Sequence, residues 1–150
     1  MTLIEQLSED LKQAMKTGNR VRVDTIRMLR NAIKNKEIDK RRSLSDEEVV
    51  EILISQMKQR RDSIEQFAKG GRQDLVEKET AELNIIQSFL PEQLSEDELR
   101  EKIREAIVET GASGLKDFGK VMKVLMPEIK GKADGKLVGE FVKGCLGGQS

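Results

Sequence analysis

Apolar residues recur at helical spacing through almost the whole sequence, and no stretch shows the alternation that is typical of a strand. Ser or Thr stands three residues before Glu at Thr2, Ser45 and Ser95, which is the pattern of a capping box at a helix start. Gly18 and Gly111 follow apolar repeats and are typical helix ends. The sequence therefore predicts an all-α protein.

Seven helices are expected, at about residues 3–17, 19–40, 45–69, 74–90, 95–110, 117–126 and 135–146. The two prolines, Pro91 and Pro127, are expected at helix ends, because proline lacks the N–H that a helix interior requires. The connection between Pro91 and Ser95 is the predicted boundary between two domains. Residues 1–92 would form an N-terminal helical domain, and residues 93–150 a small three-helix C-terminal domain.

The third and fourth helices are expected to form a long antiparallel hairpin that turns at Gly70 and Gly71. Arg60 and Glu79 each occupy one position of the apolar seams, and the register of the hairpin places them opposite each other. A buried charge needs a partner, so the two are predicted to form an ion pair that fixes the register. Binding of a substrate carboxylate by Arg60 is the alternative.

The composition excludes several kinds of chemistry. Histidine, Trp and Tyr are absent, and Cys145 is the single cysteine. Catalysis that depends on an imidazole, His-ligated zinc and an internal disulfide are therefore excluded. No phosphate-binding loop or dinucleotide fingerprint is present. We expect no catalytic residue, no metal and no cofactor, and no activity of the chain in isolation.

No run of 18 apolar residues occurs, and the first residues lack the pattern of a signal peptide. We therefore expect a cytoplasmic protein without a membrane partner. The four Phe residues, the only aromatic side chains, are expected in the core. Unpaired bases would then find no aromatic platform, so any bound RNA should be a folded one, held by its backbone and shape.

A formal net charge of 0 hides a basic start, an acidic middle and a basic tail. One candidate anion-binding surface is a cationic stripe on the second helix, where residues seven apart lie on nearly the same face. It consists of Arg20, Arg27, Arg30, Lys34 and Arg41. The stripe could contact phosphates. The alternatives are a solvated face or pairing with acidic residues of the same fold.

The other candidate lies in the tail. Lys116, Lys120 and Lys123 share one face of the sixth helix, opposite its apolar residues. The loop that follows adds Lys130, Lys132, Lys136, Gly131 and Gly135. Glycines permit close backbone approach, and the loop leads into a helix N-terminus, which favours an anion. The alternative is an ordinary solvated turn in which Asp134 caps the helix itself.

Three segments carry a family resemblance: TIRMLRNAIKNKEID at 25–39, KQRRDSIEQFAKGGRQDLVEKETAEL at 58–83 continued by SFLPEQLSEDEL at 88–99, and DFGKVMKVLMPEIKGKADGKLV at 117–138. With them the chain resembles the YqeY-like proteins of the GatB/YqeY family over nearly its whole length. The resemblance implies a two-part helical fold. It also implies kinship with the tail of the B subunit of the glutamine-dependent aminoacyl-tRNA amidotransferase, which helps to hold tRNA. The positions it marks are Gly119, Lys120, Met122, Gly131, Lys132, Asp134 and Gly135.

The expected function is a stand-alone, non-catalytic module that binds tRNA or another folded RNA through the basic tail. It would act beside an amidotransferase or another tRNA-handling enzyme, and DNA is not an expected partner. One alternative is a protein-interaction adaptor that uses the helical hairpin. Another is an accessory component of a carbon–nitrogen ligase that takes glutamine as amido donor.

Overall fold

The computed structural model describes residues 1–147, and these residues form helices without any strand. The predicted all-α class is therefore confirmed. The helices are α1 (Leu3–Thr17), α2 (Arg20–Lys40), α3 (Asp46–Lys69), α4 (Gln73–Gln87), α5 (Glu96–Thr110), the short 3-10 helix η1 (Leu115–Asp117), α6 (Phe118–Ile129) and α7 (Gly135–Leu146). The contacts divide the chain into one unit that ends at Pro91 and a second that begins at Glu92.

Local capping explains where several of the helices begin and end. The Thr2 hydroxyl accepts the Glu5 N–H at 3.1 Å, and the Glu5 carboxylate accepts the Thr2 N–H at 3.2 Å. Ser45 and Ser95 form the same reciprocal pair with the Glu three residues later. Each pair satisfies backbone donors that the first helical turn leaves without partners. Gly18 and Gly111 end α1 and α5 with φ of 71° and 66°, a conformation that glycine adopts without strain.

Two helix ends differ from the predictions. Helix α4 ends at Gln87, four residues before Pro91. At this end the Ser88 hydroxyl donates a hydrogen bond to the Ile85 carbonyl. Helix α6 continues through Pro127 to Ile129, so the prediction that Pro127 ends it is wrong. The proline removes one hydrogen bond in the last turn. The extra turn places Ile129 without exposed surface in the core of the second unit, which offsets the missing hydrogen bond.

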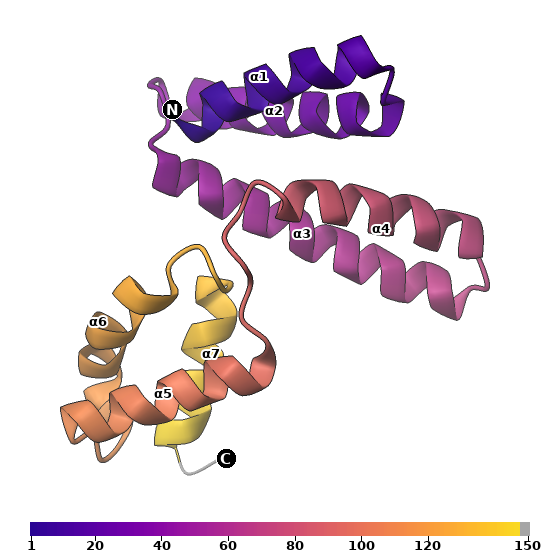
Figure 1. The fold of residues 1–150 in the computed structure, drawn as a ribbon. Coiled ribbons are helices and arrows are strands. Elements are labelled where there is room, and N and C mark those ends of the chain that lie inside the picture. The colour runs from indigo at the N-terminus through magenta and orange to yellow at the C-terminus, as the bar shows by residue number, and fades with distance from the viewer. Residues whose placement is uncertain (148–150) are drawn as a thin grey trace. The chain divides into compact units, whose positions relative to one another are not determined.

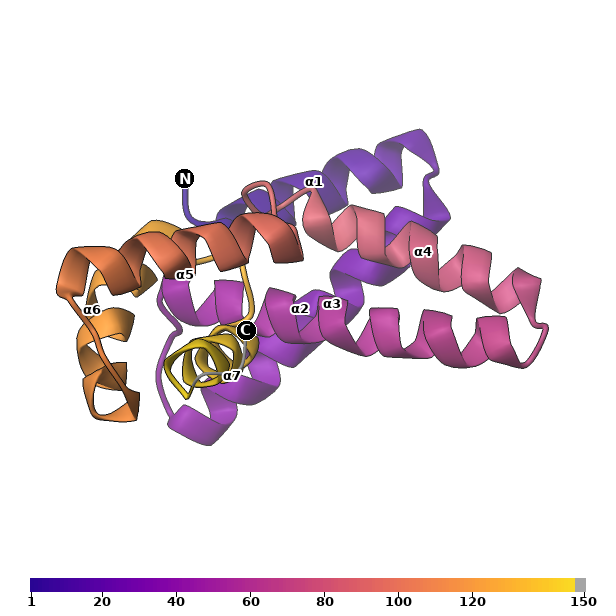
Figure 2. The same cartoon turned by 90° about the horizontal axis from the view of Figure 1, so that it is seen from below.

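The first unit consists of two helical hairpins, α1 with α2 and α3 with α4 (Figure 1). Helix α2 packs against each of the other three helices. Its Ile26 and Leu29 have no exposed surface, and neither do Leu53 and Met57 on α3. The antiparallel pairing of α3 and α4 is plain in both views (Figures 1 and 2).

The second unit packs α5, α6 and α7 around a separate aliphatic core. Ile103, Val121, Leu125 and Val138 have no exposed surface. Leu94 and Gln93, which precede α5, donate hydrogen bonds to the carbonyls of Lys132 and Gly131 at 2.9 and 2.7 Å. The start of the unit is thus tied to the loop between α6 and α7.

Arg60 is a buried charge inside the first unit, with 6% of its surface exposed. Its Nε lies 3.4 Å from a carboxylate oxygen of Glu82 on α4. Nη1 donates to the backbone carbonyl and the side-chain oxygen of Gln56 at 3.1 and 2.7 Å, and Nη2 lies against Sδ of Met28. The buried guanidinium thus joins three helices.

The acidic partner of Arg60 is therefore Glu82, which corrects the predicted pair with Glu79. A helical side chain leans toward the N-terminus of its own helix, and arginine is long. Its contact with Gln56, one turn back, shows this direction. Since α3 and α4 are antiparallel, one turn toward the start of α3 is one turn toward the end of α4. Glu82 stands there, three residues after Glu79.

Two variants, each without one of the acidic side chains, test whether Glu82 or Glu79 is the partner of Arg60. Glu82→Ala should lower the free energy of unfolding by roughly 3 kcal/mol, because it leaves a buried guanidinium without its carboxylate. Glu79→Ala should cost less than about 1 kcal/mol. Urea unfolding followed by helical circular dichroism measures both. An equal decrease for the two variants would contradict the structural pairing.

Candidate functional site

Within residues 1–147, no three Cys, Asp or Glu side chains gather closely enough to hold a metal ion. None of the described helices is both long and apolar enough to cross a bilayer. Cys145 is half-buried and forms no disulfide.

The tail lysines form one exposed surface on η1 and α6. Lys116, Lys120 and Lys123 are exposed and follow one another at spacings of four and three residues. The opposite side of α6 places Val121 and Leu125 in the core without exposed surface. Since the core holds that side, the three ammonium groups must face solvent. No hydrogen bond or ion pair of these lysines is found in the described part of the chain.

Asp117 is an acidic residue that interacts electrostatically with Lys120 and Lys116 of this face. It accepts the Ser113 N–H at 2.9 Å. This hydrogen bond lowers the pKa of Asp117, and the charges of Lys120 and Lys116 lower it further. The carboxylate is thus held ionised at the end of η1, where it offsets part of the charge of the lysine face.

Lys143 on α7 is a further exposed lysine of this unit and was not among the predicted residues. Its Nζ lies 5.3 Å from the centre of the Phe118 ring at the start of α6, a cation–π distance. Its spacing of seven residues from Lys136 was the available signal, because residues seven apart share a helix face. We call Lys116, Lys120 and Lys123 the lysine face.

Gly119 lies within this face at the second residue of α6 and is exposed. A Cβ built on it would meet no atom within 4 Å. Neither packing nor a positive φ therefore requires glycine here. Glycine in a helix is less stable than alanine by up to about 1 kcal/mol, and nothing within the unit explains that cost. What glycine provides here is free space above the helix backbone.

The loop between α6 and α7 has a structural role instead. Gly131 has a φ of 77°, and its carbonyl accepts a hydrogen bond from Gln93. Asp134 accepts the Lys136 N–H at 3.1 Å, so it caps α7 itself. A Cβ on Gly135 would approach Met126 at 3.9 Å, an ordinary contact. The start of α7 was part of the predicted anion site, but Asp134 already caps it. Lys130 and Lys136 are exposed, and Lys132 is half-buried.

The predicted stripe of helix α2 is divided by the tertiary structure. All five residues are exposed, but only Arg27, Arg30 and Lys34 line a common groove, between α1 and α2. Arg20 is the first residue of α2, and Arg41 follows its last turn. Neither of these two lines the groove.

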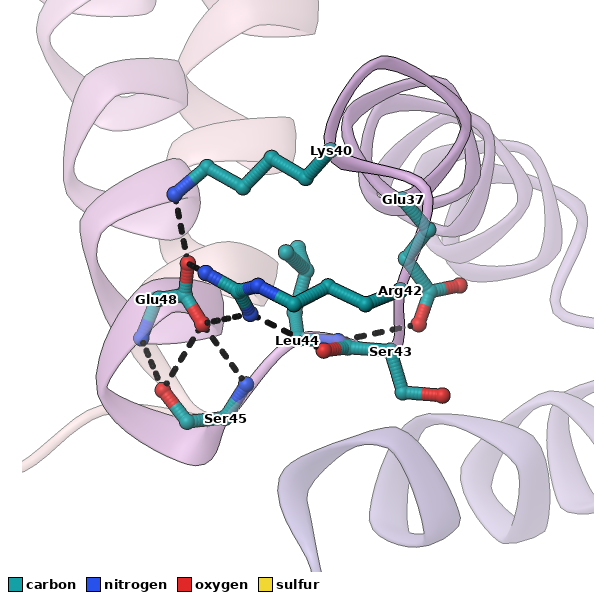
Figure 3. Close-up of polar contacts among 7 residues, drawn as sticks. All are labelled: Glu37, Lys40, Arg42, Ser43, Leu44, Ser45 and Glu48. Atoms are coloured by element: carbon teal, nitrogen blue, oxygen red, sulfur yellow. Dashed lines mark hydrogen bonds and ion pairs between the residues drawn. The ribbon is translucent and has the colours of Figure 1, made fainter.

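The densest group of charges lies where α2 passes into α3, around Glu48 (Figure 3). Lys40 Nζ lies 2.6 Å from one carboxylate oxygen, and the Arg42 guanidinium binds both oxygens at 2.8 and 2.9 Å. Ser45 donates its N–H to the same carboxylate at 3.1 Å. The carboxylate of Glu37 accepts the N–H of the buried Leu44. Sequence analysis missed this cluster, which holds the connection between the two helices.

The two cations and the capping serine stabilise the ionised form of Glu48. Hydrogen bonds from Arg42 and then Lys40 hold its pKa far below the ordinary value. A carboxyl group whose pKa is lowered by folding stabilises the fold at neutral pH, and this contribution declines as the pH falls below the unfolded pKa of about 4.5.

The fold and these surfaces define a helical protein of two units with several exposed charged faces. The model of the Yqey-like protein family matches residues 4–146, so the chain belongs to this family and the predicted resemblance is confirmed.

Curated relatives share the name "Altered inheritance of mitochondria protein 41, mitochondrial". The one from Pyrenophora tritici-repentis is 32% identical over 97% of this chain and 81% of its own length. That from Saccharomyces cerevisiae (strain YJM789) is 34% identical over 89% of this chain and 71% of its own. That from Lachancea thermotolerans is 41% identical over 71% of this chain and 58% of its own. These relatives are named as mitochondrial proteins, a finding that contradicts the cytoplasmic location expected from the sequence.

Glu48→Gln should lower the melting temperature at pH 7, and the difference from the wild type should shrink at about pH 2.5, where the unfolded carboxyl is protonated. Thermal unfolding at both pH values measures this. Glu51→Gln, which removes an exposed carboxylate of the same helix, is the matched control. A difference that grows toward low pH would contradict the role given to Glu48.

Gly119→Ala should raise the free energy of unfolding by about 0.4–1 kcal/mol, because the methyl group meets open space and alanine favours the helix. Denaturant unfolding measures the change. Gly111→Ala should be destabilising in the same assay, because its φ of 66° strains any side chain. Reduced stability of the Gly119→Ala variant would show that the glycine serves packing after all.

Proposed function

We propose that the chain is a non-catalytic binding module that holds folded RNA, and tRNA in particular, through the lysine face of its second unit. The observation that carries this proposal is the set of exposed lysines on η1 and α6 beside the open backbone of Gly119. The module would act beside an amidotransferase or another tRNA-handling enzyme. This part rests on the resemblance to the tRNA-holding tail of the amidotransferase B subunit.

The charge and shape of the lysine face suit a phosphate backbone. Lysine ammonium groups are point charges that contact phosphates without demanding one geometry or base. The missing side chain of Gly119 leaves room for a phosphate or ribose to approach α6 beside these lysines.

The same surface offers little for reading unpaired bases. Phe118, the aromatic residue of α6, is half-buried and lies under Lys143 of α7. Stacking of bases on aromatic rings is the usual basis of single-strand recognition. Contacts to the backbone and shape of a folded RNA therefore remain as the mode of binding.

Lys120→Glu combined with Lys123→Glu should weaken binding of bulk tRNA about tenfold or more, without preference for any species, because it places two negative charges where cations would meet phosphates. Filter binding across a range of salt concentrations measures the affinity and its salt slope. The slope should flatten by about 0.7–0.9 for each phosphate that the variant no longer neutralises. The free energy of unfolding should change by less than about 0.5 kcal/mol.

The matched control is Lys12→Glu combined with Lys69→Glu, which changes the net charge equally at two side chains of the first unit that are each 68% exposed. It should bind tRNA nearly as the wild type does. Unchanged affinity in the Lys120 and Lys123 variant, or no affinity of the wild type at low salt, would overturn the proposed function.

A further inference from the structure

A groove of about 460 Å³ lies between α1 and α2 in the first unit. Its floor is apolar and consists of Ile4, Leu7 and Ile33. Leu7 and Ile33 are also part of the core, with 0% and 4% of their surface exposed, so the floor is fixed by the packing of the unit.

The rim of the groove is cationic. Arg27, Arg30 and Lys34 follow one another at spacings of three and four residues along α2, and all are exposed. No hydrogen bond or ion pair of these three side chains is found among residues 1–147. Two other cations of the same helix do have partners, since Arg22 pairs with Asp10 and Lys40 with Glu48. Three cations around this groove thus have no bonded acidic partner among the described residues.

The acidic residue among the lining residues offsets only part of this charge. Glu37 lines the groove, and its carboxylate also accepts the N–H of Leu44 at 3.1 Å, so the lining residues keep a surplus of positive charge. A groove of about 380 Å³ on the other side of α2 differs in this respect. There Lys36 and Lys40 face the carboxylates of Asp39, Glu48 and Glu51.

The stripe continues into an exposed apolar residue. Ile38 stands eleven residues after Arg27, which is close to three helical turns, and 64% of its surface is exposed. The stripe from Arg27 to Ile38 is about 16 Å long at 1.5 Å per residue. It therefore presents three cations and then an apolar side chain along the edge of an apolar floor.

A partner for this surface must supply both anionic and apolar groups. A phosphate backbone supplies charge but gains nothing by covering Ile4 or Ile38, because only apolar groups gain free energy from such contact. An amphipathic helix supplies both, since carboxylates at spacings of three and four residues share one face beside an apolar stripe. About three turns of such a helix would match the distance from Arg27 to Ile38 along α2.

We propose that the groove between α1 and α2 binds an acidic amphipathic helix of a partner protein. Its carboxylates pair with Arg27, Arg30 and Lys34, and its apolar side chains cover Ile4 and Ile38. This interaction is independent of the RNA proposed for the second unit and uses none of the lysine face. The module would thereby bind a protein through one unit and RNA through the other.

The probe is a fluorescent 14-residue helical peptide with Glu at positions that match the three cations and Leu on the adjacent stripe. Two matched peptides replace every Glu by Gln, or every Leu by Ser. Anisotropy titrations of the full chain should show binding of the first peptide and at least about tenfold weaker binding of each of the other two, because each lacks one half of the match.

On the protein side, Arg27→Glu combined with Lys34→Glu should weaken binding of the acidic peptide about tenfold or more. Arg20→Glu combined with Lys36→Glu is the matched control, because it changes the same helix by the same charge outside this groove. Both variants should retain the wild-type melting temperature and wild-type tRNA affinity, which separates this test from that of the lysine face.

Three results would overturn the proposal. One is that the wild type does not bind the peptide with Glu and Leu. Another is that the variant with Arg27 and Lys34 replaced binds this peptide as tightly as the wild type does. Reduced tRNA affinity of that variant, with no peptide binding by the wild type, would instead assign the groove to RNA.

Discussion

Burial of one apolar stripe on α2 organises the first unit. Ile26, Leu29 and Ile33 lie in the core, and α2 packs against α1, α3 and α4. The chain has no Trp or Tyr, so aliphatic side chains carry this core, each contributing roughly 1.5–3 kcal/mol when fully buried. Because the stripe sets the rotation of α2 about its axis, it also sets where the other residues of that helix point. Arg27, Arg30 and Lys34 consequently face the groove with α1.

The buried guanidinium of Arg60 is a second constraint, but it follows from the packing rather than directing it. The apolar residues of α3 and α4 set the register of the hairpin by their own burial, and Met57 and Ile86 have no exposed surface. Arg60 then reaches back along α3 to Gln56 and across to Glu82. A paired charge at this depth adds little net stability. Its main effect is to penalise any arrangement that would leave it without Glu82.

The two candidate surfaces differ in what surrounds their charges. The lysine face has open backbone at Gly119 and a half-buried Phe118, so it offers charge without an apolar floor. The groove between α1 and α2 has a floor of Ile4, Leu7 and Ile33 beneath its cations. Charge alone suits phosphates, whereas charge beside an apolar floor suits an amphipathic helix. A family member with both would be able to bring an RNA and a protein together without catalysing a reaction itself.

The sequence alone determined the helices, most of their ends and the exposure of the tail lysines, because caps and apolar periodicity act within a few residues. Thr2, Ser45 and Ser95 are examples. Tertiary structure decided the acidic partner of Arg60, the continuation of α6 through Pro127, and the division of the α2 stripe by one groove. It also separated Gly119, with open space above it, from Gly131, which a loop requires. These outcomes depend on side-chain length and direction and on the spacing between helices, which no local pattern in the sequence specifies.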